Sequence, residues 1–151
     1  MRQEFFGIEQ LNFVEFNITG DDLNCQRLSE ESRFLSSEVF NLFAACFEKS
    51  NDLYEYFEPT KFNARKIVVL HNQLHIYLET LKLISNSKEF TSFIEKIFLG
   101  KAYIAEIELQ DPIWRENWSI HLSHLTTINL EMISVVDRCI DEAKILWIIG
   151  Y

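Results

Sequence analysis

Glycine and proline are scarce in this chain, which has 4 Gly and 2 Pro among its 151 residues. Folds built from many turns and short strands need more of both, so the scarcity favours helices. A chain of this length is expected to form one domain, residues 1–151, with a hydrophobic core of its own. We therefore expect an all-α fold.

Cysteine is also infrequent, and its pattern lacks the pairs that disulfide frameworks and zinc sites use. Cys25, Cys46 and Cys139 are widely spaced, odd in number and without a Cys-x-x-Cys motif. This spacing favours free thiols in a reducing compartment. The N-terminus shows no signal-peptide pattern, and no apolar run reaches the roughly 18 residues of a membrane span. We expect a soluble, cytoplasmic protein without membrane contact.

Basic residues are too few to balance the acidic ones: 14 Lys and Arg stand against 23 Asp and Glu, a net charge of −9. Residues 1–60 alone hold twelve acidic and four basic residues. Direct nucleic-acid binding is not expected, because neutralising phosphates requires a basic surface. A basic protein partner is favoured instead. The candidate contacts are acidic pairs at turns: Asp21, Asp22, Glu30 and Glu31.

The apolar residues follow helical spacing in several long segments. One helix is expected from Ser29 or Ser32 to about Lys49, a second from Thr60 to about Ile84, and a shorter one from Ser87 to Leu99. In the second, Val69, Ile76 and Leu83 form an extra stripe that suggests another neighbour, such as a second copy of the chain. These segments predict a helical bundle of three long helices and one shorter helix.

The third long helix is expected to occupy the last forty residues, 111–151. Asp111 suits the N-cap, Pro112 suits the first helical position, and Gly150 suits the end. A single apolar stripe runs between them at steps of three and four residues. No Asp, Glu, Lys or Arg occurs from Asn117 to Leu130, so we expect this part to pack against neighbouring helices or a second copy.

One segment near the N-terminus has a strand pattern instead. Val14, Phe16 and Ile18 alternate with Glu15 and Asn17, as in a half-buried strand. Residues 101–110 alternate too, although Tyr103 and Ile107 also fit a helix. A small two-stranded addition formed by residues 11–18 and 102–109 is therefore a possible extra element of the bundle.

The four histidines fall as two pairs at helical spacing. His71 and His75 are four residues apart, with Glu79 continuing the row, and His121 and His124 are three apart. The helical period places only His121 inside, and the Glu-x-x-His repeats of di-iron bundles are missing. We expect no metal site and no cofactor. His121 with Trp114 and Trp118 is the candidate ligand pocket, which makes a small-ligand-binding bundle one alternative function.

A second alternative comes from Arg115, which precedes His121 by six positions, and from Arg65, which precedes His71 in the same way. This spacing resembles the Arg-x(4–6)-His signature of HEPN-type helical ribonucleases. The resemblance implies a small all-α bundle that dimerises and places paired Arg and His at a shared cleft. It would make Arg115 and His121 the catalytic pair of a ribonuclease or of a degenerate relative.

No phosphate-binding glycine loop and no nucleophile motif is present, so we expect a protein that is not an enzyme. The leading hypothesis is a small acidic protein that binds another protein, as an inhibitor or immunity-type partner of a basic protein. Its basis is the negative charge gathered in the first sixty residues.

Overall fold

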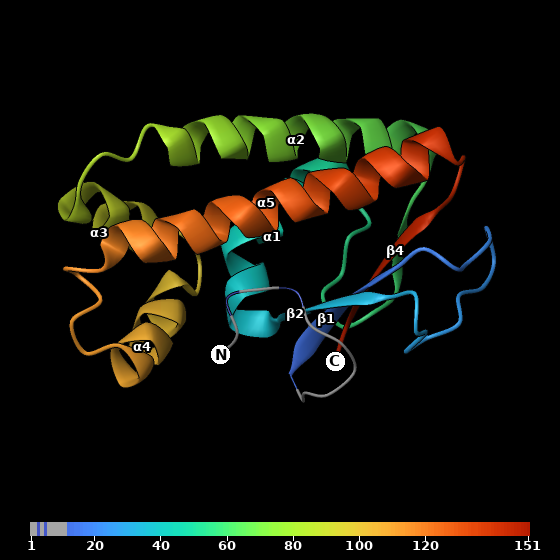
Figure 1. Cartoon of the computed structure of the whole chain (residues 1–151). Helices are drawn as coiled ribbons and strands as arrows, with labels where there is room; N and C mark the ends of the chain where they lie inside the picture. Colours follow the sequence, from blue (N-terminus) through green and yellow to red (C-terminus); the bar gives the residue numbers. More distant parts are fainter. Residues whose placement is uncertain (1–2, 4, 6–11) are drawn as a thin grey trace.

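The structure, a computed structural model, describes Gln3, Phe5 and residues 12–151. Within these residues the chain forms five helices and four strands, so the expected all-α bundle is wrong (Figure 1). The helices are α1 (Ser37–Ser50), α2 (Ala64–Lys82), α3 (Ser87–Glu95), α4 (Gly100–Gln110) and α5 (Trp118–Asp141). The strands are β1 (Phe13–Asn17), β2 (Arg33–Ser36), β3 (Thr60–Phe62) and β4 (Leu146–Gly150).

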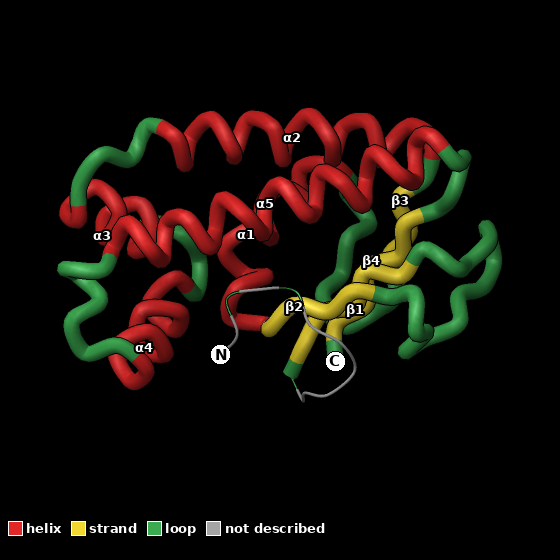
Figure 2. The backbone as a smooth tube through the Cα atoms, in the orientation of Figure 1, coloured by secondary structure: helices red, strands yellow, loops and turns green. Residues whose placement is uncertain are grey.

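The four strands form one antiparallel sheet in the order β2-β1-β4-β3 (Figure 2). Glu15 in β1 is paired with Phe34 of β2 on one side and with Ile149 of β4 on the other. The strand expected within residues 11–18 is therefore confirmed by β1. Its expected partner, residues 102–109, is wrong because that segment is helix α4, with Tyr103 and Ile107 buried.

The last forty residues are not one helix. Helix α5 ends at Asp141, Ala143 takes a left-handed backbone with φ 52°, and the chain then returns to the sheet as β4. Residues Leu146 to Ile149 are all buried. A strand buried on both faces is an unbroken apolar run, and periodicity cannot separate such a run from a buried helix. Its aromatic and β-branched residues suit a strand.

The start of α5 also lies later than expected. The Asp111 carboxylate accepts hydrogen bonds from the Ile113 N–H (3.2 Å) and from the Asn117 side chain (3.0 Å). These bonds close a turn over residues 112–117 instead of capping a helix. Asp111 therefore makes the type of bond that an N-cap makes, but it lies six residues before the N-cap of α5, Asn117.

Helices α1 and α2 begin later than expected because a short strand precedes each of them. Residues 33–36 and 60–62 join the sheet as β2 and β3, so α1 begins at Ser37 and α2 begins at Ala64. The N-cap of α3 is Asn86, whose side chain accepts the Glu89 N–H, and not Ser87. The helix expected from Ser87 to Leu99 ends earlier, at Glu95, and α4 begins at Gly100.

Helix α1 packs on one face of the sheet, α2 and α5 run side by side along the molecule, and α3 and α4 lie at the end away from the sheet (Figure 1). Phe16 of β1 meets Phe40 and Phe47 of α1 with ring centroids 6.0 and 5.9 Å apart. Residues 18–32 pass over the opposite face, where the Trp147 indole donates to the Asp21 carbonyl (3.1 Å). The sheet is therefore buried on both sides.

Two features expected to be covered are exposed. The second stripe of α2, Val69, Ile76 and Leu83, faces away from the core, with Leu83 81% exposed. On α5, Ile120 and Leu130 of the uncharged segment are about half exposed. A second copy of the chain on either surface stays a prediction. No helix in the described part of the chain is long and apolar enough to cross a membrane.

Candidate functional site

An apolar groove of about 710 Å³ runs along α1 and is the clearest candidate site. Most of its lining comes from the outward side of α1, from the turn region that follows α1, and from the connection between α3 and α4, which is distant in sequence. We call it the aromatic groove. Its lining includes Glu38, Asn41, Ala44, Ala45, Glu48, Tyr54, Tyr56, Phe57, Tyr77, Lys96, Ile97, Phe98, Leu99 and Tyr151.

Large apolar side chains of the aromatic groove are open to solvent. Phe57 is 81% exposed, Phe98 is 85% exposed, and Leu99 beside it is 48% exposed. Exposing such side chains together costs hydration free energy, and contiguous apolar patches commonly mark interaction sites. The groove therefore has the surface character of a binding site.

The backbone that presents Phe98 and Leu99 is strained. Leu99 takes a left-handed backbone conformation, φ 63° and ψ 7°, which residues other than glycine seldom adopt. Gly100 is required next to it, because an added Cβ would collide with the Ile94 carbonyl. Strained backbone of this kind clusters at functional sites. The corner between α3 and α4 is thus fixed so that two apolar side chains point outward.

Charged residues lie at intervals along the groove. Glu38 and Glu48 are at opposite ends of α1, and Lys96 follows α3. None of the three forms an ion pair with another described residue. Asn41, between the two glutamates, makes no side-chain hydrogen bond within the same residues. These groups are available to a ligand.

The tyrosines of the groove offer few free hydroxyl groups. Tyr77 donates to the Leu42 carbonyl (2.7 Å), and Tyr151 donates to Glu15 (2.7 Å). The Tyr54 hydroxyl is buried without a hydrogen-bond partner among the described residues. Burial raises the pKa of Tyr54 and of Tyr77 well above the ordinary value, so both phenols stay neutral. The aromatic residues of the groove therefore offer few free hydrogen-bond donors.

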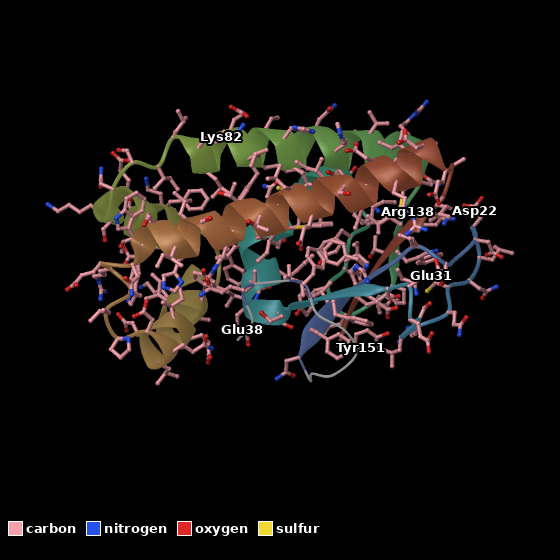
Figure 3. The ribbon with its side chains drawn as sticks, in the orientation of Figure 1. Asp22, Glu31, Glu38, Lys82, Arg138 and Tyr151 are labelled. Carbon is pink, nitrogen blue, oxygen red and sulfur yellow. The ribbon has the colours of Figure 1, made fainter. Side chains whose placement is uncertain are left out.

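The acidic residues predicted to contact a partner all lie within residues 18–32, the segment that covers the sheet; Asp22 and Glu31 are labelled in Figure 3. All four are exposed, but two of them also hold the local structure. Asp21 accepts the backbone N–H groups of Leu23 and Asn24, which lowers its pKa, and Asp22 pairs with Lys61 at 3.1 Å. We call residues 18–32 the acidic loop. Of its four acidic residues, Glu30 and Glu31 therefore make the fewest side-chain contacts with other described residues.

A buried carboxylate anchors the acidic loop to the sheet. Glu15 of β1 is fully buried and accepts the Leu28 N–H (2.9 Å), the Ser32 hydroxyl (2.6 Å) and the Tyr151 hydroxyl (2.7 Å). Burial is the main cause that raises the pKa of Tyr151, and the bond to Glu15 adds to it. Each donor would lose its partner without Glu15, so this residue fixes where the acidic loop lies.

A second cavity of about 570 Å³ lies between the sheet and α5. Its lining mixes apolar residues with two acidic and two basic ones, and it includes Glu31 of the acidic loop. The described residues that line it are Phe5, Phe16, Ile18, Glu31, Arg33, Glu131, Ser134, Val135 and Arg138. Charges of both signs give it no clear preference for one ligand charge.

Trp114 and His121, predicted to form a ligand pocket with Trp118, have internal partners. Trp114 is fully buried, and its indole donates to Glu108 (3.2 Å). His121 is buried, as the helical period indicated, with Nε2 3.0 Å from Asp111 and Nδ1 3.0 Å from Gln3. Neither the aromatic groove nor the second cavity is lined by these residues. A ligand there stays a prediction.

The structure gives Arg115 and His121 separate partners. Arg115 pairs with Glu108 at 3.0 Å and stacks on the Trp114 ring, 4.5 Å from its centroid. His121 is bonded to Asp111 instead. Arg115 also lies in the turn before α5, so the two residues do not share one helix. The resemblance to HEPN-type ribonucleases implied an all-α fold, and the observed fold contains a four-stranded sheet instead.

The other histidine pair, His71 and His75 of α2, lies where α2 contacts α5. His71 Nε2 is 3.0 Å from Asp137 and 3.2 Å from His75 Nε2. In the part of the chain that the structure describes, no group of three or more His, Cys, Asp or Glu could hold a metal ion. These contacts join two helices and add no candidate chemistry.

Sequence reasoning missed the groove residues, because it expected one helix from Ser87 to Leu99 and so included Phe98 in it. Gly100 was the signal in the sequence that could have found them. A helix that ends before this glycine leaves the residues just in front of it exposed. A search of protein-family models, curated proteins and solved structures found no match for this chain.

Proposed function

We propose that this protein acts by binding another protein whose contact surface is apolar and basic, in the manner of an inhibitor or immunity-type partner. The observation that carries the proposal is the aromatic groove, where Phe57 and Phe98 are more than four-fifths exposed. Burying such aromatic side chains at an interface supplies much of the binding free energy in protein complexes.

The charge of the chain supports a basic partner. The net charge is −9, and Glu30 and Glu31 extend from the acidic loop while Glu38 and Glu48 flank the aromatic groove. Negative potential over both surfaces accelerates the approach of a positively charged protein. The three cysteines are free thiols, which suits the cytoplasm as the location of the complex.

The test is the association rate with a panel of small basic proteins, nucleases among them, at low and high salt. We expect association that slows as salt is added. The double variant Glu30→Gln/Glu31→Gln should slow it further at low salt. Glu116→Lys at the far end of the molecule changes the net charge equally and serves as the control. No association, or rates indifferent to salt and to the loop charges, would refute the proposal.

A further inference from the structure

We infer that the aromatic groove takes one amphipathic helix of the partner, about three turns long, with a basic residue near each end. The inference rests on the proposed function and specifies the part of the partner that is recognised. Three observations on the groove carry it: the lack of backbone partners, the small residues of α1, and the spacing of its charges.

The lining of the groove favours a helix over an extended segment. None of the described lining residues belongs to a strand, so this part of the chain offers no strand edge in the groove on which a partner strand could pair. The hydroxyls of Tyr77 and Tyr151 already donate to Leu42 and Glu15, and that of Tyr54 is buried. An extended segment would therefore find few donors for its carbonyls beyond Asn41 and Lys96, whereas a helix pairs its own backbone groups.

The outward side of α1 lets another helix come close. Ala44 and Ala45 are the smallest side chains in the groove, and both are at least partly exposed. Small residues permit close helix packing, and apolar side chains of the incoming helix would then reach Phe57 and Phe98. Anchors spaced three, four and seven residues apart are the usual pattern for this mode of binding.

The charges along the groove set the length and the sign of the helix. Glu38 and Glu48 are ten residues apart on α1, which corresponds to roughly 15 Å and about three helical turns. A helix lying along α1 with Lys or Arg separated by the same rise would meet both carboxylates. Lys96 adds a site for one acidic side chain. Neither glutamate has an ion pair with another described residue that the helix would have to replace.

The test is selection from a displayed library of random peptides, each about 16 residues long, against the whole protein. We expect enrichment of helix-forming sequences with an apolar stripe and with basic residues about ten positions apart. Ala45→Trp fills the groove and should weaken the selected peptides by roughly tenfold or more. Asn72→Trp places the same side chain on the exposed side of α2 and should leave their affinity unchanged.

A second variant keeps the inference testable if Ala45→Trp does not fold. Glu38→Gln/Glu48→Gln adds no bulk, and selection against it should no longer enrich basic residues at the two ends. Enrichment of proline-rich peptides, equal affinity for the Ala45→Trp variant, or no enrichment at all would overturn the inference. Salt-dependent association with basic proteins that Ala45→Trp still weakens, without enrichment of helical peptides, would reject the helix and leave the proposed function standing.

Discussion

At the scale of single residues, internal hydrogen bonds explain why His121 and Asp111 are structural. Both ring nitrogens of His121 have a partner, and Asp111 joins the helix α5 to the turn before it. Hydrogen bonds from Asn117, and then from His121, hold the pKa of Asp111 below its ordinary value of 3.8. A carboxyl group with a lowered pKa stabilises the fold only where it is ionised.

The first prediction concerns the pH dependence of this carboxylate. Its stabilisation is complete above the unfolded pKa and is lost as the pH falls through the lower, folded pKa. Asp111→Asn should therefore lower the Tm near neutral pH, and the difference from wild type should shrink in acid. Thermal unfolding followed from about pH 7 to about pH 2 measures both. A Tm difference that stays constant over this range would contradict the assignment.

The second prediction concerns Asn129, a polar side chain in the core. It is fully buried in α5, and neither its amide nitrogen nor its oxygen has a partner among the described residues. Replacing an unpaired buried amide with an apolar group of similar size removes a desolvation cost. Asn129→Leu should raise the free energy of unfolding by about 1 kcal/mol in urea denaturation. A loss of stability would mean that the amide is bonded in solution.

At the scale of elements, the corner between α3 and α4 depends on one glycine. Gly100 is buried, and a methyl group there would meet the Ile94 carbonyl. We predict that Gly100→Ala lowers the free energy of unfolding by about 2 kcal/mol or more, measured in urea. Lys101→Ala, at the exposed next position, should change it by less than about 0.5 kcal/mol. Equal effects of the two changes would show that the corner is not tightly packed.

The acidic loop depends on Glu15 in the same way. Glu15→Gln keeps the size of the side chain but turns one acceptor atom into a donor, which faces N–H or O–H groups from Leu28, Ser32 or Tyr151. We predict a loss of about 1–3 kcal/mol in stability and faster proteolysis within residues 18–32. Glu30→Gln in the exposed part of the loop should change neither. Unaltered proteolysis in Glu15→Gln would contradict the anchor.

Elements defined by local pattern were predictable, and those defined by distant pairing were not. The apolar stripes of α1, α2 and α3 lie within their expected ranges, and the alternation over residues 13–17 predicted β1. Strand β4 was not predicted, because its buried run follows a helix and pairs with β1 and β3 across most of the chain. The short strands β2 and β3 were not predicted, because each lies directly before a helix and nearby residues were interpreted as helix N-caps.

At the scale of the whole molecule, the same limit applies to the candidate site. The acidic composition of residues 1–60 was visible in the sequence, and it still motivates the choice of a basic partner. The aromatic groove was not visible, since it forms only when α1, Tyr54 to Phe57 and Lys96 to Leu99 meet. Phe98 fitted a helical stripe and became exposed because its helix ends at Glu95.

The most direct measurement is the Kd of a selected helical peptide for two variants matched in exposure. Phe98 in the groove is 85% exposed, and Leu83 on α2 is 81% exposed. Phe98→Ser should raise the Kd by roughly tenfold, about 1.4 kcal/mol, because it removes an aromatic contact from the groove. Leu83→Ser should leave it within about twofold. A Kd that rises for Leu83→Ser, or that is unchanged for Phe98→Ser, would contradict the account.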